Sequence, residues 1–91
     1  MTLEQEVSGI VNRLNDTSYY NFKVIRFNST NVLILDINFK NWYYDVSYKD
    51  NELYVEFSNL NEVDNSVTRS MIADWENIIE TILNRERLSI F

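Results

Sequence analysis

The side chains best able to do chemistry in this 91-residue chain are carboxylates. Three of them, Asp36, Asp45 and Glu56, occur in segments where apolar and polar residues alternate. Carboxylates that lie side by side can transfer protons, bind a divalent cation or attract a basic surface. Which of these chemistries applies depends on the strands that carry the three side chains and on the face to which they point.

The residue types that the sequence lacks exclude several kinds of chemistry. The chain contains no histidine, cysteine or proline, and Gly9 is its single glycine. It therefore has no imidazole base, no thiolate nucleophile, no Cys/His zinc set and no glycine-rich phosphate loop. A carboxylate pair needs a desolvated cleft for acid–base catalysis, and Ca²⁺ needs a loop that wraps it; a flat, hydrated sheet offers neither. We expect a protein without enzymatic activity, cofactor or metal site.

Alternation with a period of two predicts strands in three consecutive segments, and a less regular segment precedes them. The predicted strands span residues 19–27, 33–39, 42–48 and 53–57. Apolar residues at helical spacing predict helices over residues 3–15 and 66–85, and Thr2 with Gln5 has the spacing of a capping box. The predicted fold class is α+β, a single domain over residues 1–91 with the order α-β-β-β-β-α. In it, the N- and C-terminal helices pack on one face of a four-stranded antiparallel meander.

Short turns set the predicted strand pairing, because turn length fixes register. Two-residue turns at residues 40–41 and 50–51, with a four-residue loop at 28–31, pair Leu35 with Val46. In this register nearly every large apolar side chain of the strands lies on the face that the helices cover. Agreement between turn lengths and apolar pattern supports this pairing.

The same register predicts a row of charged residues on the open face, which the helices do not cover. The row consists of Lys23, Asp36, Asp45 and Glu56. Neighbouring carboxylates in such a row are about 5 Å apart, and like charges directly opposite each other destabilise a sheet by about 0.2–1 kcal/mol. The row is either an acidic binding surface or a set of side chains that spread into water. Arg26 is the one charged residue placed on the covered face.

Apolar residues also fall on the predicted open face. They are Ile25, Phe27, Val32, Ile34, Tyr43 and Tyr54. An apolar cluster beside an acidic row is typical of a binding patch. The alternative is that the C-terminal tail, residues 88–91, folds over the cluster and covers it. The aromatic residues of the other face belong to the core rather than to a base-stacking surface, because no basic residues surround them.

The net charge of −6 disfavours direct contact with nucleic acid or anionic lipid and favours a basic protein partner. The longest apolar run, residues 32–35, is too short to span a membrane, and the N-terminus lacks the pattern of a signal peptide. We therefore expect a cytoplasmic protein without membrane contact.

Two functions remain open. The first is a DNA-mimic-like inhibitor, of the anti-restriction or anti-CRISPR kind made by phages and mobile elements, which occupies the basic surface of a nuclease or another DNA-handling protein. Its predicted contact residues are Asp36, Asp45, Glu56, Tyr43, Tyr54, Asp74, Glu76 and Glu80. The second is a structural or adaptor module that homodimerises through its open sheet face, its tail or an edge strand.

Overall fold

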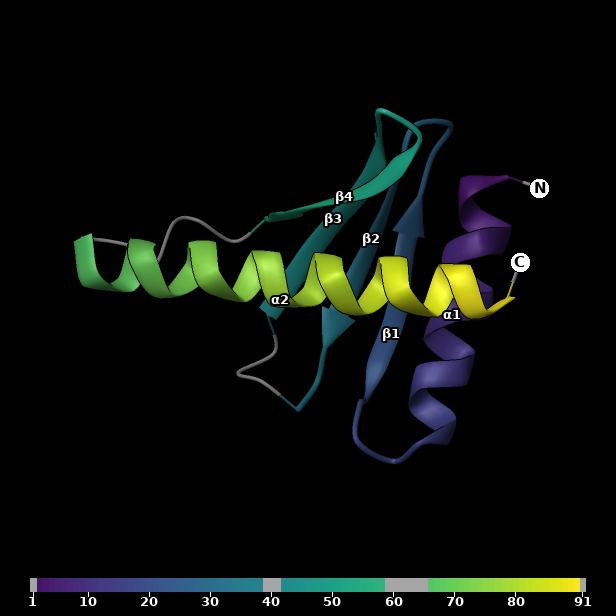
Figure 1. Cartoon of the computed structure of the whole chain (residues 1–91), viewed down its shortest axis with the longest axis horizontal. Helices are drawn as coiled ribbons and strands as arrows, with labels where there is room; N and C mark the ends of the chain where they lie inside the picture. Colours follow the sequence, from purple (N-terminus) through teal and green to yellow (C-terminus); the bar gives the residue numbers. More distant parts are fainter. Residues whose placement is uncertain (1, 39–41, 59–65, 91) are drawn as a thin grey trace.

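The computed structural model describes residues 2–38, 42–58 and 66–90. Its elements are α1 (Leu3–Asp16), β1 (Phe22–Phe27), β2 (Asn31–Asp36), β3 (Trp42–Lys49), β4 (Glu52–Phe57) and α2 (Ser66–Ile90). The strands form one antiparallel sheet in the order β1-β2-β3-β4, and α2 crosses the strands on the face that α1 also covers (Figure 1). The predicted α+β meander is confirmed.

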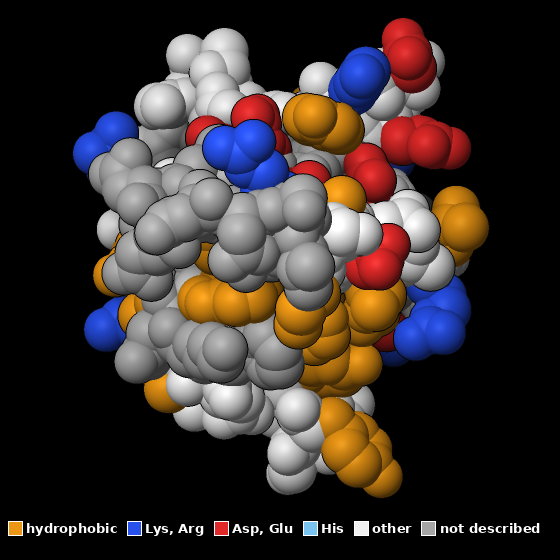
Figure 2. All heavy atoms as spheres, turned by 90° about the vertical axis from the view of Figure 1, so that its left-hand side faces the viewer, with side chains coloured by type: hydrophobic (Ala, Val, Ile, Leu, Met, Phe, Trp, Pro, Cys, Tyr) orange, Lys and Arg blue, Asp and Glu red, His pale blue; other side chains and the backbone are white. Residues whose placement is uncertain are grey.

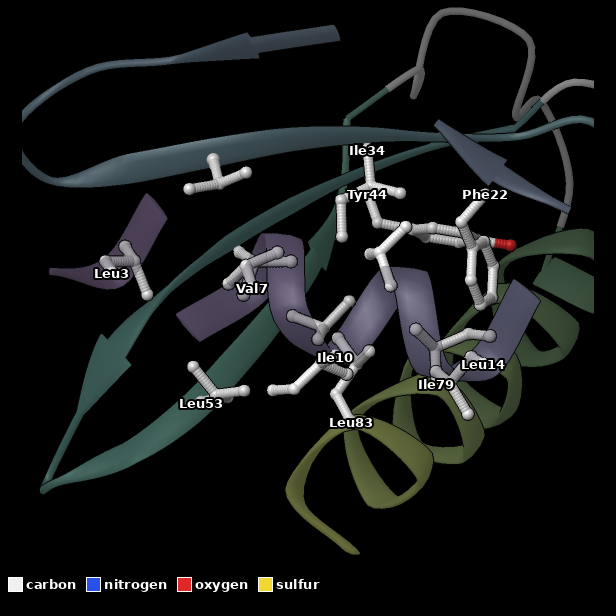
Figure 3. Packing of buried hydrophobic residues seen from close by; sticks show 14 of the residues in the cluster. Leu3, Val7, Ile10, Leu14, Phe22, Ile34, Tyr44, Leu53, Ile79 and Leu83 are labelled. Atoms are coloured by element: carbon white, nitrogen blue, oxygen red, sulfur yellow. The ribbon is translucent and has the colours of Figure 1, made fainter. Parts of the chain in front are cut away.

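A capping box and an apolar stripe in the sequence explain why helix α1 forms. The Thr2 side chain accepts a hydrogen bond from the Gln5 N–H, and the Gln5 side chain accepts one from the Thr2 N–H, which completes the capping box. The apolar stripe of the helix is buried: Leu3, Val7, Ile10, Val11 and Leu14. The stripe faces the inner side of the sheet and α2, so that one core lies between the sheet and the two helices (Figure 3).

The turn between β3 and β4 is the predicted one. Asp50 and Asn51 have positive φ angles of 53° and 65°, as both central residues of a two-residue type I′ hairpin turn require. Val46 therefore pairs with Val55, and Asp45 pairs with Glu56, as predicted.

The predicted register between β2 and β3 is wrong by three positions. Strand β2 ends at Asp36 and β3 begins at Trp42, and these two residues are partners, so the connection is longer than the predicted turn at residues 40–41, which lie outside the described residues. Because side chains alternate with a period of two, an odd shift moves every residue of β2 to the other face. Leu35 now pairs with Tyr43 instead of Val46.

The consequence is a reversal of the two faces of β2. Val32, Ile34 and Asp36 point into the core, while Leu33 and Leu35 lie on the open face. The run Val32–Leu35 is apolar at every position, so its pattern does not favour one face over the other. The prediction that Val32, Ile34 and Phe27, the partner of Val32, lie on the open face is therefore also wrong.

Arg26, which was predicted on the covered face, lies on the open face next to a bulge in β1. Phe27 pairs with Val32, as the predicted loop requires, but the register shifts between Val24 and Arg26. Arg26 is opposite Leu33, as in the predicted register, so the reversal of β2 moves Arg26 to the open face. The bulge keeps Val24, which is opposite Ile34, on the covered face.

Helix α2 continues through Ile90, beyond the predicted end at Arg85. The last residues of the described chain are therefore helical and lie on the covered side of the sheet (Figure 1). The prediction that residues 88–91 fold over the open face is wrong for residues 88–90, and Phe91 lies outside the described residues.

Candidate protein-interaction surface

The open face of the sheet carries two rows of side chains that run across the strands, since directly paired residues share a face. The first row, from β1 to β4, is Arg26, Leu33, Asp45 and Glu56, and the second is Lys23, Leu35 and Tyr43. Tyr54 lies on the same face, opposite Ser47. We call Leu33, Leu35, Tyr43, Tyr54, Asp45 and Glu56 the open-face patch. Its four apolar members are partly exposed.

Asp45 and Glu56 are the part of the acidic row that the structure retains. They are directly opposite each other on β3 and β4. The Asn31 side-chain amide donates a hydrogen bond of 2.7 Å to Asp45, which offsets part of the repulsion between the two carboxylates. Leu33 stands beside Asp45 where Asp36 was predicted, so the acidic row has two members instead of three.

Asp36 is buried on the other face. Its carboxylate accepts a hydrogen bond of 2.9 Å from the Tyr44 hydroxyl, whose oxygen accepts one of 2.5 Å from the Trp75 indole N–H. Asp36 also lines a pocket of about 140 Å³ beside Trp75 on α2. The carboxylate thus belongs to a polar chain within the core, where each buried polar group needs a partner, and the prediction that it lies in an open acidic row is wrong.

The predicted contact residues Glu76 and Glu80 bind the edge of the sheet. With Asn84 they stand at four-residue spacing on α2, on the side that runs along β4. The Phe57 N–H donates to the Glu76 carboxylate at 2.8 Å, and the Leu53 N–H donates to the Asn84 side-chain oxygen at 3.0 Å. Between them, the Val55 N–H donates to the Glu80 carboxylate. These residues cap an edge strand that would otherwise present unpaired N–H groups. The i, i+4, i+8 polar spacing was visible in the sequence, but the strand it meets was not.

Of the three predicted acidic residues on α2, only Asp74 is exposed without a role in this edge. It lies on α2, which covers the opposite face from the open-face patch (Figure 1). The eight predicted contact residues therefore divide between the open face, the core, the β4 edge and the surface of α2.

The first residue of the edge strand β1 is hydrogen-bonded to α1. The Asn15 side chain at the end of α1 accepts from the Phe22 N–H (2.9 Å) and donates to the Phe22 carbonyl (2.8 Å). The bulge before Arg26 then interrupts the strand. Capped and bulged edges disfavour pairing with another strand.

Sequence reasoning missed a second buried carboxylate, Glu6 on α1. Arg87 of α2 forms an ion pair with it, and the Tyr48 hydroxyl of β3 donates a hydrogen bond to it. Arg87 also donates to the Asn51 carbonyl at 2.6 Å, at the β3–β4 turn. This cluster joins both helices to the sheet, and its charges are paired rather than available for chemistry.

We expect the protein to lose stability in alkaline solution because two tyrosine hydroxyls donate to carboxylates. Burial, with a smaller effect of Asp36, raises the pKa of Tyr44 well above 10.0, although the bond from Trp75 opposes this. Burial, followed by Glu6, raises the pKa of Tyr48 to about 12. A tyrosine whose folded pKa exceeds its unfolded pKa contributes stability that is complete below the unfolded pKa and lost as pH rises above it.

Above about pH 10, Tyr44 alone should lower the free energy of unfolding by up to about 1.4 kcal/mol per pH unit. Urea unfolding measured between about pH 8 and pH 11.5 checks this. Tyr48→Phe should make the decline shallower. A free energy of unfolding that stays constant across this range would contradict the expectation.

Searches for relatives found no match to this chain among family models, curated proteins or solved structures. Within the described ranges, the acidic residues form no group of three or more that could hold a metal ion. Neither helix, over the residues that the structure describes, is long and apolar enough to cross a bilayer.

Proposed function

We propose that this chain is a non-catalytic protein-binding domain that docks its open sheet face onto the surface of another protein molecule. The observation that carries the proposal is the apolar character of both faces of β2. Val32 and Ile34 fill the core, while Leu33 and Leu35 lie on the open face beside Tyr43. A central strand with apolar residues on both faces is typical of a sheet that is covered on both sides.

The composition of the open-face patch supports the same conclusion. Leu33, Leu35 and Tyr43 lie on the two central strands, together with Asp45. The charged residues Lys23, Arg26 and Glu56 lie on the two outer strands. An apolar, aromatic centre with a charged rim is the usual composition of a protein–protein interface.

An acidic inhibitor of a basic, nucleic-acid-binding protein remains the second candidate. The net charge of −6 and the adjacent pair Asp45–Glu56 favour it. Against it, Asp36 is buried and Glu76 and Glu80 are bound to the β4 edge. On the side of the molecule seen in Figure 2, acidic and basic side chains are interspersed, which differs from the continuous negative field of a nucleic acid.

Photo-crosslinking tests the proposed docking face. Tyr43→p-benzoylphenylalanine places the crosslinker in the centre of the patch, and the same substitution at the exposed Asn77 of α2 is the matched control. In cells that make this protein naturally, the Tyr43 variant should give a discrete covalent adduct and the Asn77 variant should not. If Tyr43 and Tyr54 variants give no adduct beyond the Asn77 background, the open face is not a docking surface.

The same adduct separates the two candidates. An acidic inhibitor should be captured with a basic protein, and its adduct should disappear as salt is raised, since exposed charges are screened over about 8 Å at physiological ionic strength. An adduct made through the apolar centre should persist in high salt.

A further inference from the structure

We propose that the molecule docked on the open face is a second copy of this chain, in a twofold-symmetric dimer whose axis runs parallel to the strands. The inference rests on the proposed function, because it requires that the open face is a docking surface. Its basis is the arrangement of charge across that face.

The open face is basic on one side and acidic on the other. Lys23 and Arg26 are on the edge strand β1, while Asp45 and Glu56 are on β3 and β4. Three strand spacings of about 4.8 Å separate β1 from β4, or about 14 Å in all. Lys49 and Glu52 also lie on this face, as opposite residues next to the β3–β4 turn, and add one charge of each sign there. The Lys49 ammonium lies over the Tyr54 ring, 4.8 Å from its centroid. The face is therefore bipolar along the direction that crosses the strands.

A bipolar face is complementary to a copy of itself in one of two orientations. When two sheets stack, a twofold axis perpendicular to the strands places β1 over β1, so that Arg26 meets the same basic edge in the second copy. A twofold axis parallel to the strands places β1 over β4, and Arg26 then faces Glu56 of the second copy at each end of the interface. Like charges oppose the first arrangement and opposite charges favour the second.

The second row supplies the apolar contacts of this arrangement. An axis parallel to the strands keeps each row opposite its own reverse, so Leu35 of one copy lies over Tyr43 of the other, and the reverse pair forms symmetrically. In the first row, Leu33 of one copy lies over Asp45 of the other. Sheets stack about 10 Å apart with their strands nearly aligned, which is close enough for leucine and tyrosine side chains to interdigitate. The dimer would cover the open face of β2 just as the helices cover its other face.

Charge exchange tests both the partner and the orientation. Sedimentation equilibrium from about 1 μM to 500 μM should show a dimer for the natural chain. Arg26→Glu makes both ends of the row from Arg26 to Glu56 negative, and Glu56→Arg makes both ends positive, so each variant should dimerise about tenfold more weakly or worse. An equimolar mixture of the two variants should restore the dimer, because opposite charges face each other again at both ends.

Both positions are exposed, so the substitutions leave the core unchanged, and circular dichroism of each variant checks the fold. Thr81→Glu on the exposed side of α2 is the matched control and should dimerise like the natural chain. Leu35→Glu should be a monomer at every concentration.

The outcomes separate this inference from the proposed function. A natural chain that stays monomeric at 500 μM, while Tyr43 crosslinks to another protein, overturns the dimer and leaves the docking face intact. A dimer that Leu35→Glu does not weaken overturns the open face as its interface. A dimer that Leu35→Glu abolishes, but in which mixing the charge variants restores nothing, overturns the parallel axis.

Discussion

Ile10→Ala should lower the free energy of unfolding by about 2–5 kcal/mol, the range for removing a large aliphatic side chain from a packed core. Ile10 has no solvent exposure, and its side chain points from α1 into the space shared with α2 and the sheet (Figure 3). The substitution therefore removes contacts with both α2 and the sheet. Urea unfolding at neutral pH measures the effect.

The neighbouring residue provides the control. A Cβ atom added at Gly9 meets no other atom within 4 Å, so Gly9→Ala introduces no clash and should raise the free energy of unfolding by about 0.5–1 kcal/mol through helix propensity. Opposite effects at adjacent positions would show that α1 faces the core as described. An Ile10→Ala variant as stable as Gly9→Ala would contradict that packing.

Tyr44→Phe should lower the free energy of unfolding by about 2–4 kcal/mol although it removes a single oxygen atom, because the buried Asp36 carboxylate and the partly buried Trp75 indole each lose a hydrogen-bond partner. The Tyr44 hydroxyl donates to Asp36 and accepts from the Trp75 indole, and Tyr44 has no solvent exposure. Without this hydroxyl, the charged Asp36 loses a donor inside the core, where desolvation is costly.

Tyr19→Phe is the matched control, since Tyr19 is 82% exposed and should change the stability by less than about 0.5 kcal/mol. Tyr44→Phe should also make the alkaline loss of stability shallower, because the Tyr44 phenol is gone and Tyr48 alone of the two raised tyrosines remains. If Tyr44→Phe and Tyr19→Phe unfold at the same urea concentration, the chain from Trp75 to Asp36 does not stabilise the core.

The inward position of Asp36 changes the functional interpretation as well as the stability. A row of Asp36, Asp45 and Glu56 would have presented a negative stripe suited to a basic target. With Leu33 in that place, the row runs from a cation through an aliphatic side chain to two carboxylates. The face becomes suited to an apolar, charge-balanced surface.

Local signals were sufficient for a large part of the architecture. The capping box at Thr2 and Gln5 and the apolar stripe of α1 specify a helix through residues that are close together in the sequence. The Asp50–Asn51 turn specifies the β3–β4 register, and hence the contact between Asp45 and Glu56, because only a tight turn with positive φ angles joins these strands.

Long-range contacts were needed for the rest. Val32–Leu35 is apolar on both faces, so strand β2 could meet the helices with either face, and its final register depends on Asp36 reaching Tyr44 in the assembled core. The bonds from Glu76 and Glu80 to β4 likewise join segments far apart in the chain. The bulge between Val24 and Arg26 is a feature of the paired strands β1 and β2. Alternation along a strand reveals that two faces exist, but packing against the helices selects which of them is covered.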